Sequence, residues 1–229
     1  MGSLELVYKR FADDAKLVTD RFSDLRLEND EFGVPNVIGK ITLYINAQST
    51  DEYFIRIKPT ALYPTFFPLV YETERKIPLN IDWHLYDDGA FCLCTVPEQI
   101  IKCTNGVNLF DFIENEVKPF LFNQTHKRLE GYFVNERKHG HLGEDEFYQE
   151  YFGTTDTRII KKLLEHVLHQ DRATRTENCI CGSGKKYRKC HRGIINKLKK
   201  IDPMHVSLLI HRIENYKANP MLKAPAFVK

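Results

Sequence analysis

The chain lacks three features that would place it in large classes of proteins. It has no apolar run long enough to cross a bilayer, which takes about 20 mostly apolar residues, so we expect no membrane span. Its N-terminus has no basic stretch followed by an apolar one, so we expect no signal peptide and a cytoplasmic location. It has no Walker loop, no Gly-x-Gly-x-x-Gly and no adenylation signature, so we expect that it does not activate a carboxylate with ATP by itself.

The composition is that of a folded protein. The 229 residues are 42% hydrophobic, which suits one domain of ordinary size with a small additional region. There are six cysteines. In a reducing compartment we expect them to serve as metal ligands, nucleophiles or core residues rather than as disulfides.

The net charge of +2 hides a strong asymmetry along the chain. From Arg158 onward there are 17 Lys and Arg against 5 Asp and Glu, whereas the preceding part has 16 against 26. This change of sign predicts a boundary near residue 156, with a domain over 1–156 and a basic helical region over 157–229.

The first part has the pattern of an α+β domain. A helical period over 4–18 comes first, followed by two alternating segments rich in β-branched residues at 36–46 and 51–58, with a turn predicted at 48–51. Prolines precede a third predicted strand within 62–72. Aromatic-rich helices are predicted at 110–122 and 144–152, and two further amphipathic helices in the basic region at 158–169 and 206–216.

One cysteine in the first domain follows an exposed turn. Cys92 comes just after Asp87-Asp88-Gly89, a turn signal, and eight residues after His84. A turn of this kind brings a thiol to the surface, and a nearby histidine can stabilise a thiolate or polarise a carbonyl group. A buried structural cysteine is the alternative.

In their order, these features resemble the ubiquitin-conjugating-enzyme fold and, more closely, its bacterial relatives. The resemblance covers about residues 4–153. It rests on the N-terminal helix, the antiparallel meander and four motifs: Tyr63-Pro64-x-x-Phe67-Pro68, Ile77-Pro78, Gly89-x-x-Cys92-Leu93, and Glu136-Arg137-x-His139-Gly140-x-x-Gly143. The fold implied has an N-terminal helix, an antiparallel meander sheet and C-terminal helices.

The resemblance implies that Cys92 forms a thioester with the C-terminus of a carried protein and passes the acyl group to an acceptor. It also implies either a separate activating enzyme or transfer from an already activated donor. Relatives of this kind occur in antiphage operons with cGAS-like nucleotidyltransferases (CBASS), which implies such an enzyme, or a ubiquitin-like protein, as the carried partner.

The other candidate catalytic residues each have a structural alternative. The eukaryotic pattern has His-Pro-Asn where this chain has Asp82-Trp83-His84, so His84 either donates to an oxyanion or caps the turn. Asp88 either orients an incoming amine or shapes the turn. His139 either contributes to the active site or packs in a predicted glycine-rich loop over 139–143.

The basic region contains a second motif, with four soft ligands in thirteen residues: Cys179, Cys181, Cys190 and His191. Thiolates and imidazole in this number suit one tetrahedral structural zinc ion. The pattern over 178–193 resembles the SEC-C zinc motif. The same stretch carries a dense set of cations, called here the basic surface: Lys185, Lys186, Arg188, Lys189, Arg192, Lys197, Lys199 and Lys200.

Three functional hypotheses follow. The first is a cysteine-dependent acyltransferase with a zinc-stabilised targeting region. The second is a non-catalytic adaptor that uses the same fold to bind a partner. The third is a protein that binds an anionic partner, nucleic acid included, through the basic surface. The acidic first domain is itself a candidate partner of that surface, within the chain or across a homodimer.

Overall fold

The computed structural model describes residues 3–169 and 176–215 of the chain. Packing divides the chain into two units, each described by itself. The first unit contains the described residues up to Cys94 together with Gly106–Glu136, and the second contains Thr95–Asn105 and the described residues from Arg137 onward. The boundary predicted near residue 156 lies inside the second unit. As a statement about independently folding domains it stays a prediction.

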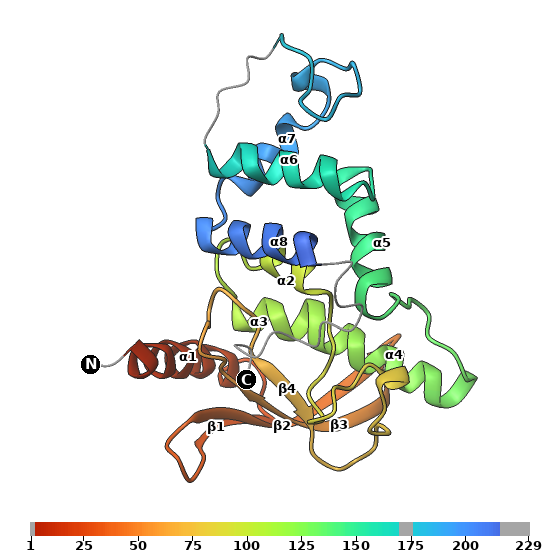
Figure 1. The fold of residues 1–229 in the computed structure, drawn as a ribbon. Helices are drawn as coiled ribbons and strands as arrows, with labels where there is room; N and C mark the ends of the chain where they lie inside the picture. The colour runs from red at the N-terminus through yellow and green to blue at the C-terminus, as the bar shows by residue number, and fades with distance from the viewer. Residues whose placement is uncertain (1–2, 170–175, 216–229) are drawn as a thin grey trace. The chain divides into compact units, whose positions relative to one another are not determined.

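A meander sheet forms the centre of the first unit (Figure 1). Its four antiparallel strands are neighbours in space in their chain order: β1 (Leu25–Asn29), β2 (Pro35–Ile45), β3 (Gln48–Lys58) and β4 (Leu69–Glu72). In β3, Tyr53, Ile55 and Ile57 are buried and the residues between them are exposed. This alternation confirms that the pattern of the sequence marks one face of the sheet as the core face.

The turn between β2 and β3 lies earlier in the chain than the sequence predicted. Asn46 and Ala47 form it with φ values of 49° and 64°, and Ile45 pairs with Gln48. Two successive residues at positive φ are typical of the type I′ turn, whose twist matches that of a hairpin. The prediction of a turn at 48–51 was wrong, because these polar residues are the start of β3, where Gln48, Ser49 and Thr50 are exposed to solvent.

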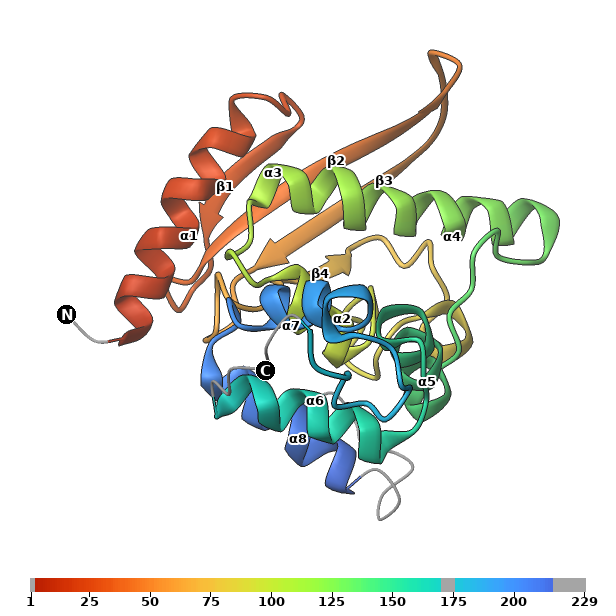
Figure 2. The same cartoon turned by 90° about the horizontal axis from the view of Figure 1, so that it is seen from above.

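Two helical segments cover one face of the sheet (Figure 2). Helix α1 (Ser3–Thr19) contacts β1 and β2 and buries Phe11, Ala15 and Val18, which confirms the predicted helical period. The other segment is formed by three consecutive pieces: α3 (Leu109–Phe112), the π-helical η2 (Ile113–Val117) and α4 (Lys118–Glu130). It includes the helix predicted at 110–122 and extends to Gly131, which takes the left-handed conformation that commonly ends a helix.

A buried carboxylate joins β3 to α4. The Asp51 side chain is only 7% exposed and pairs with Lys76 Nζ and with Arg128 Nη2 at 2.6 Å. Thr125 Oγ1 donates to the same carboxylate at 2.7 Å and lies 2.8 Å from the Tyr53 hydroxyl. Burial alone would raise the pKa of Asp51, but the hydrogen bonds from Lys76, Thr125 and Arg128 hold it well below its usual range.

Replacing Asp51 by Asn is expected to lower the free energy of unfolding by about 1–3 kcal/mol at pH 7, because two cations lose their buried partner. Lys76 and Arg128 are 30% and 40% exposed, so solvent relieves part of the cost. The measurement is urea unfolding. Asp13→Asn, which changes an exposed ion pair with Lys16, is the control and should shift stability by less than about 0.5 kcal/mol.

The difference in free energy of unfolding between wild type and Asp51→Asn should become smaller at acidic pH. A depressed folded-state pKa stabilises the fold above the unfolded pKa of about 3.9, and this stabilisation is lost as pH falls toward the folded-state value. Between pH 7 and pH 3 the gap should therefore shrink by about 1 kcal/mol. A gap that does not change with pH would show that Asp51 is not held ionised by its partners.

The second unit is helical within its described residues. It contains α2 (Val96–Lys102), α5 (Gly140–Phe152), α6 (Thr157–Leu168), the short η3 (Tyr187–Lys189), α7 (Arg192–Leu198) and α8 (Pro203–Asn215). The helices predicted at 158–169 and 206–216 correspond to α6 and α8. A buried ion pair joins Glu144 of α5 to Arg212 of α8. Within the described ranges, no helix combines the length and apolar character needed to span a bilayer.

Helix α5 begins four residues before the predicted helix at 144–152. The stretch predicted as a glycine-rich loop is its first turn, with His139 at the N-cap. Gly143 is required there, because a Cβ atom at this position would lie 1.9 Å from the Lys138 carbonyl oxygen. The glycine therefore permits a close approach of the backbone, and the prediction of a loop over 139–143 was wrong.

Candidate functional site

A short hairpin in the first unit carries Cys92. Leu85 and Phe91 form its bridge, Tyr86 N donates to Ala90 O at 2.9 Å, and Gly89 N closes the turn on Tyr86 O at 2.8 Å. Gly89 has a φ of 84°, which favours glycine. The Asp-Asp-Gly turn predicted from the sequence is present.

The hairpin places His84 and Cys92 directly opposite each other. Cys92 N donates to His84 O at 2.7 Å, and these two residues are next to the bridged pair Leu85 and Phe91. The Cys92 side chain is half-buried. Burial raises the pKa of the Cys92 thiol, and a hydrogen bond with Tyr86 acts in the opposite direction. The net shift is upward, so the group is a thiol rather than a thiolate at neutral pH.

His84 has a conformation that is unusual for a residue with a side chain. It ends the 3₁₀ turn η1 (Ile81–Trp83) with a φ of 53°, and its N–H donates to Ile81 O. Its ring packs edge-on against Phe133 with centroids 5.1 Å apart, and its Nε2 lies 3.9 Å from a Glu136 carboxylate oxygen. A left-handed non-glycine residue that surrounding contacts hold in place is common at functional sites.

Contacts from α4 hold the segment before His84. The Gln124 amide donates to Trp83 O at 3.0 Å. Lys127 Nζ lies 4.9 Å from the centre of the Trp83 ring and 4.1 Å from that of Phe133. No local pattern indicates the contacts of Gln124 and Lys127 with Trp83, since they join residues more than 40 positions apart.

The remaining predicted catalytic residues have different positions. Asp88 is exposed, and its carboxylate accepts the Ala90 N–H at 3.1 Å, so it shapes the turn. His139 belongs to the second unit, where it is the N-cap residue of α5. Cys92, His84 and Asp88 therefore share one hairpin region of the first unit, and their catalytic roles stay predictions.

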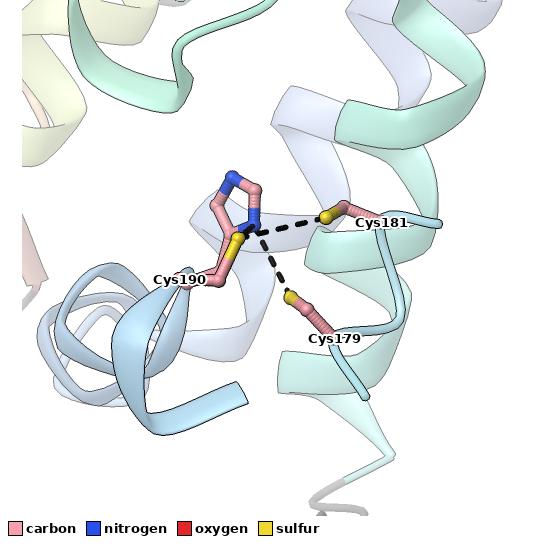
Figure 3. Close-up of side chains that lie close together, drawn as sticks. Cys179, Cys181 and Cys190 are labelled. Atoms are coloured by element: carbon pink, nitrogen blue, oxygen red, sulfur yellow. Dashed lines mark hydrogen bonds between the residues drawn. The ribbon is translucent and has the colours of Figure 1, made fainter. Parts of the chain in front are cut away.

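The second candidate site brings together Cys179, Cys181, Cys190 and His191 (Figure 3). Their ligand atoms all lie within 4.8 Å of one another. His191 Nδ1 is 3.3 Å from Cys179 Sγ and 3.2 Å from Cys190 Sγ, and Cys181 Sγ is 3.7 Å from Cys190 Sγ. Such separations are those of donors around a single tetrahedral ion, and three thiols with one imidazole form a donor set that zinc prefers.

Two glycines allow this loop to fold back. Gly182 and Gly184 have φ values of 80° and 71°, which residues with side chains rarely adopt. Cys179 N donates to Lys185 O at 2.8 Å, and Tyr187 N donates to Glu177 O at 2.9 Å. The ligands before and after the glycines are thereby brought to the same end of the loop.

Two groups outside the ligand set orient it. His191 Nε2 lies 3.0 Å from the Phe152 carbonyl oxygen at the end of α5. If Nε2–H donates to this oxygen, Nδ1 is left with its lone pair directed at the thiols, as in most metal-bound histidines. Ser183 Oγ is hydrogen-bonded to Cys181 Sγ at 3.2 Å. Burial would raise the pKa of Cys181, but the bonds with Ser183 and with the neighbouring thiols lower it to about 6.

Residues 175–193 match the SEC-C motif family. The match includes all four clustered ligands and closely follows the range of 178–193 predicted from the sequence. The SEC-C assignment of this segment is confirmed. No curated protein matches the chain.

Proposed function

We propose that this protein is an acyltransferase similar to ubiquitin-conjugating enzymes, in which Cys92 carries the C-terminal acyl group of a protein as a thioester. The arrangement of α1, a four-stranded antiparallel meander, a cysteine-bearing hairpin and a long following helix supports this proposal. The observation that carries it is the hydrogen bond between Cys92 N and His84 O. It fixes a thiol-bearing and an imidazole-bearing residue opposite each other beside an exposed turn.

The proposed reaction has two transfers. The Cys92 sulfur attacks the carbonyl carbon of an activated C-terminal acyl group. The C–S bond forms, the bond to the leaving group breaks, and the thiol proton passes to that leaving group. An acceptor amine then attacks the thioester carbonyl, forming a C–N bond, and the sulfur leaves and regains a proton. We propose that a separate enzyme activates the carboxyl group as an adenylate or a thioester.

The raised pKa of Cys92 is compatible with this chemistry. A thiol of higher pKa is less ionised, but its thiolate is intrinsically more nucleophilic. An already activated acyl donor reacts with a less reactive nucleophile than an unactivated amide would need. The same property makes Cys92 a poor candidate for attack on unactivated substrates.

For the carried protein we propose a cGAS-like nucleotidyltransferase or a ubiquitin-like protein, with a role in antiphage defence. For the second unit we propose a structural zinc ion bound by Cys179, Cys181, Cys190 and His191. Four protein ligands would complete the tetrahedron and leave no position for substrate. The zinc would hold the loop in its folded form, and the chemistry would belong to the first unit.

The test of the acyltransferase proposal is intact-mass spectrometry of the full chain co-expressed with the proteins of its own operon. We expect a covalent adduct that is heavier than the chain by the mass of the carried protein less one water, and which a thiol reductant releases. Absence of any adduct with every operon partner present would contradict the proposal.

His84 gives a more specific prediction. His84→Gly keeps the positive φ while removing the imidazole, and should slow acyl transfer by roughly 10²–10³-fold if the ring donates to the oxyanion. His84→Asn tolerates the same backbone conformation and retains a donor, so it should restore part of the rate. His211→Ala, at an exposed histidine of α8, is the control. Wild-type rates in His84→Gly would show that His84 only ends the 3₁₀ turn.

An adaptor without catalysis is the second candidate function. The half-burial of Cys92 and its raised pKa favour it, because both lower thiol reactivity. In that case the first unit would bind a partner without a covalent bond, and the zinc-bound loop would tether the complex. Equal binding of the same partner by wild type and Cys92→Ala, with no adduct in either, would favour the adaptor.

A further inference from the structure

The loop that contains the cysteine and histidine cluster, together with α7, carries positively charged side chains and no negatively charged ones. Residues 178–201 contain the eight cations of the basic surface and no Asp or Glu. Seven of the eight are exposed, and Arg192 is half-buried. The segment is nevertheless anchored, because its Tyr187, Ile195 and Leu198 side chains are buried. The charges are therefore held on a folded support rather than on a free tail.

Several cations elsewhere in the described residues are paired with carboxylates. In the first unit Lys76 and Lys40 are paired with Asp51 and Glu52, and in the second unit Lys161 is paired with Glu214. Within 3–169 and 176–215, by contrast, none of the eight cations of the basic surface has a carboxylate oxygen within 4.0 Å. Unneutralised like charges on a small surface repel one another, and a bound polyanion would relieve that repulsion.

The side chains between the cations indicate which polyanion fits. A protein interface normally has an apolar or aromatic core, but no large hydrophobic residue of 178–201 is exposed. Single-stranded nucleic acid is usually bound by stacking on exposed aromatic rings, and Tyr187, the one aromatic residue in the segment, is 5% exposed. A regular array of phosphates requires neither feature.

We propose that the basic surface binds the phosphodiester backbone of double-stranded nucleic acid without reading its sequence. Lysine and arginine side chains would replace the counterions along the duplex, which makes the affinity strongly dependent on salt. This activity is separate from the thiol chemistry proposed for the first unit, and a failure of one would leave the other standing.

The experiment uses the zinc-loaded full chain and a fluorescein-labelled mixed-sequence DNA duplex of about 20 base pairs, followed by anisotropy. With about four phosphate contacts, log Kd should rise with log salt with a slope of about 3.6, which is a loss of about 10²-fold between about 50 and about 200 mM salt. Changing the duplex sequence should leave Kd the same within about twofold.

A quadruple variant locates the binding surface. Replacing Lys185, Lys186, Arg188 and Lys189 by Ala should weaken binding by at least about tenfold and lower the salt slope by about 0.9 for each phosphate that the variant no longer neutralises. The control replaces Arg10, Lys16, Arg26 and Lys40 of the first unit by Ala, with the same change in net charge, and should bind like wild type. Metal analysis must show that both variants retain zinc.

Three results would overturn the proposal. The first is a salt slope below about 1. The second is an equal decrease of affinity in the quadruple variant and in its control, which would show that only net charge matters. The third is displacement of the duplex by poly-glutamate as efficiently as by unlabelled duplex at equal charge, which would assign the surface to an acidic protein.

Discussion

Replacing Cys181 by Ser is expected to abolish zinc binding and to unfold the segment around residues 176–200, while the first unit stays folded. Structural zinc contributes an apparent free energy of about 10–16 kcal/mol at pH 7 in small zinc-dependent modules, which is far more than the short helices here could supply by packing. The loop has few other means of stabilisation, since its glycines favour no single conformation and its cations repel one another.

Two measurements test this prediction. Elemental analysis of wild-type protein purified without chelators should give one zinc per chain. Hydrogen exchange should become fast in 176–200 of Cys181→Ser and stay slow in β2 and β3. Cys94→Ser, which changes a half-buried cysteine outside the cluster, should retain its zinc. Wild-type protein that contains no zinc would contradict the assignment.

Replacing Cys92 by Ala is expected to abolish the covalent adduct completely, because the alanine side chain has no nucleophilic atom that could form the acyl bond. Cys92→Ser should instead trap an adduct that forms more slowly and resists thiol reductants. The hydroxyl is a weaker nucleophile than the thiol, and the oxyester it forms has a poorer leaving group than a thioester has. The two variants therefore distinguish a thioester at Cys92 from attachment elsewhere.

The control for this pair is Cys94→Ala, which should keep the adduct with its wild-type sensitivity to thiol. Intact-mass spectrometry reports the adduct, and digestion locates the modified residue. If the adduct persists in Cys92→Ala, the nucleophile lies elsewhere and the proposed chemistry is wrong. If wild type forms none with its operon partners, the adaptor hypothesis replaces it.

Much of the local structure was predictable from the residues themselves. Phe11, Ala15 and Val18 recur at helical spacing, and Tyr53, Ile55 and Ile57 recur at the spacing of a strand, because burial of one face imposes these periods. The four ligands of the cysteine and histidine cluster were found for a similar reason. They lie within thirteen residues, so the glycines between them are enough to bring them together.

Contacts between distant parts of the chain followed from no such local pattern. Only the tertiary structure shows that Asp51 is buried among Lys76, Thr125 and Arg128, that His191 is oriented by the carbonyl oxygen of Phe152, and that Phe133 packs on His84. These partners come from segments that are far apart in the sequence. No periodic pattern in the sequence indicates which of these residues will be in contact.

The two wrong predictions also concern features that depend on the three-dimensional structure. Polar residues at 48–51 indicated a turn, but hairpin twist placed it at Asn46 and Ala47, leaving Gln48, Ser49 and Thr50 on an exposed part of β3. Glycines at 140 and 143 indicated a loop, but Gly143 permits the close approach of Lys138 at the start of α5. The sequence by itself determined the core periods, the SEC-C ligands and the turn before Cys92. The tertiary structure decided how deeply the Cys92 thiol is buried, because burial depends on neighbours that local sequence does not specify.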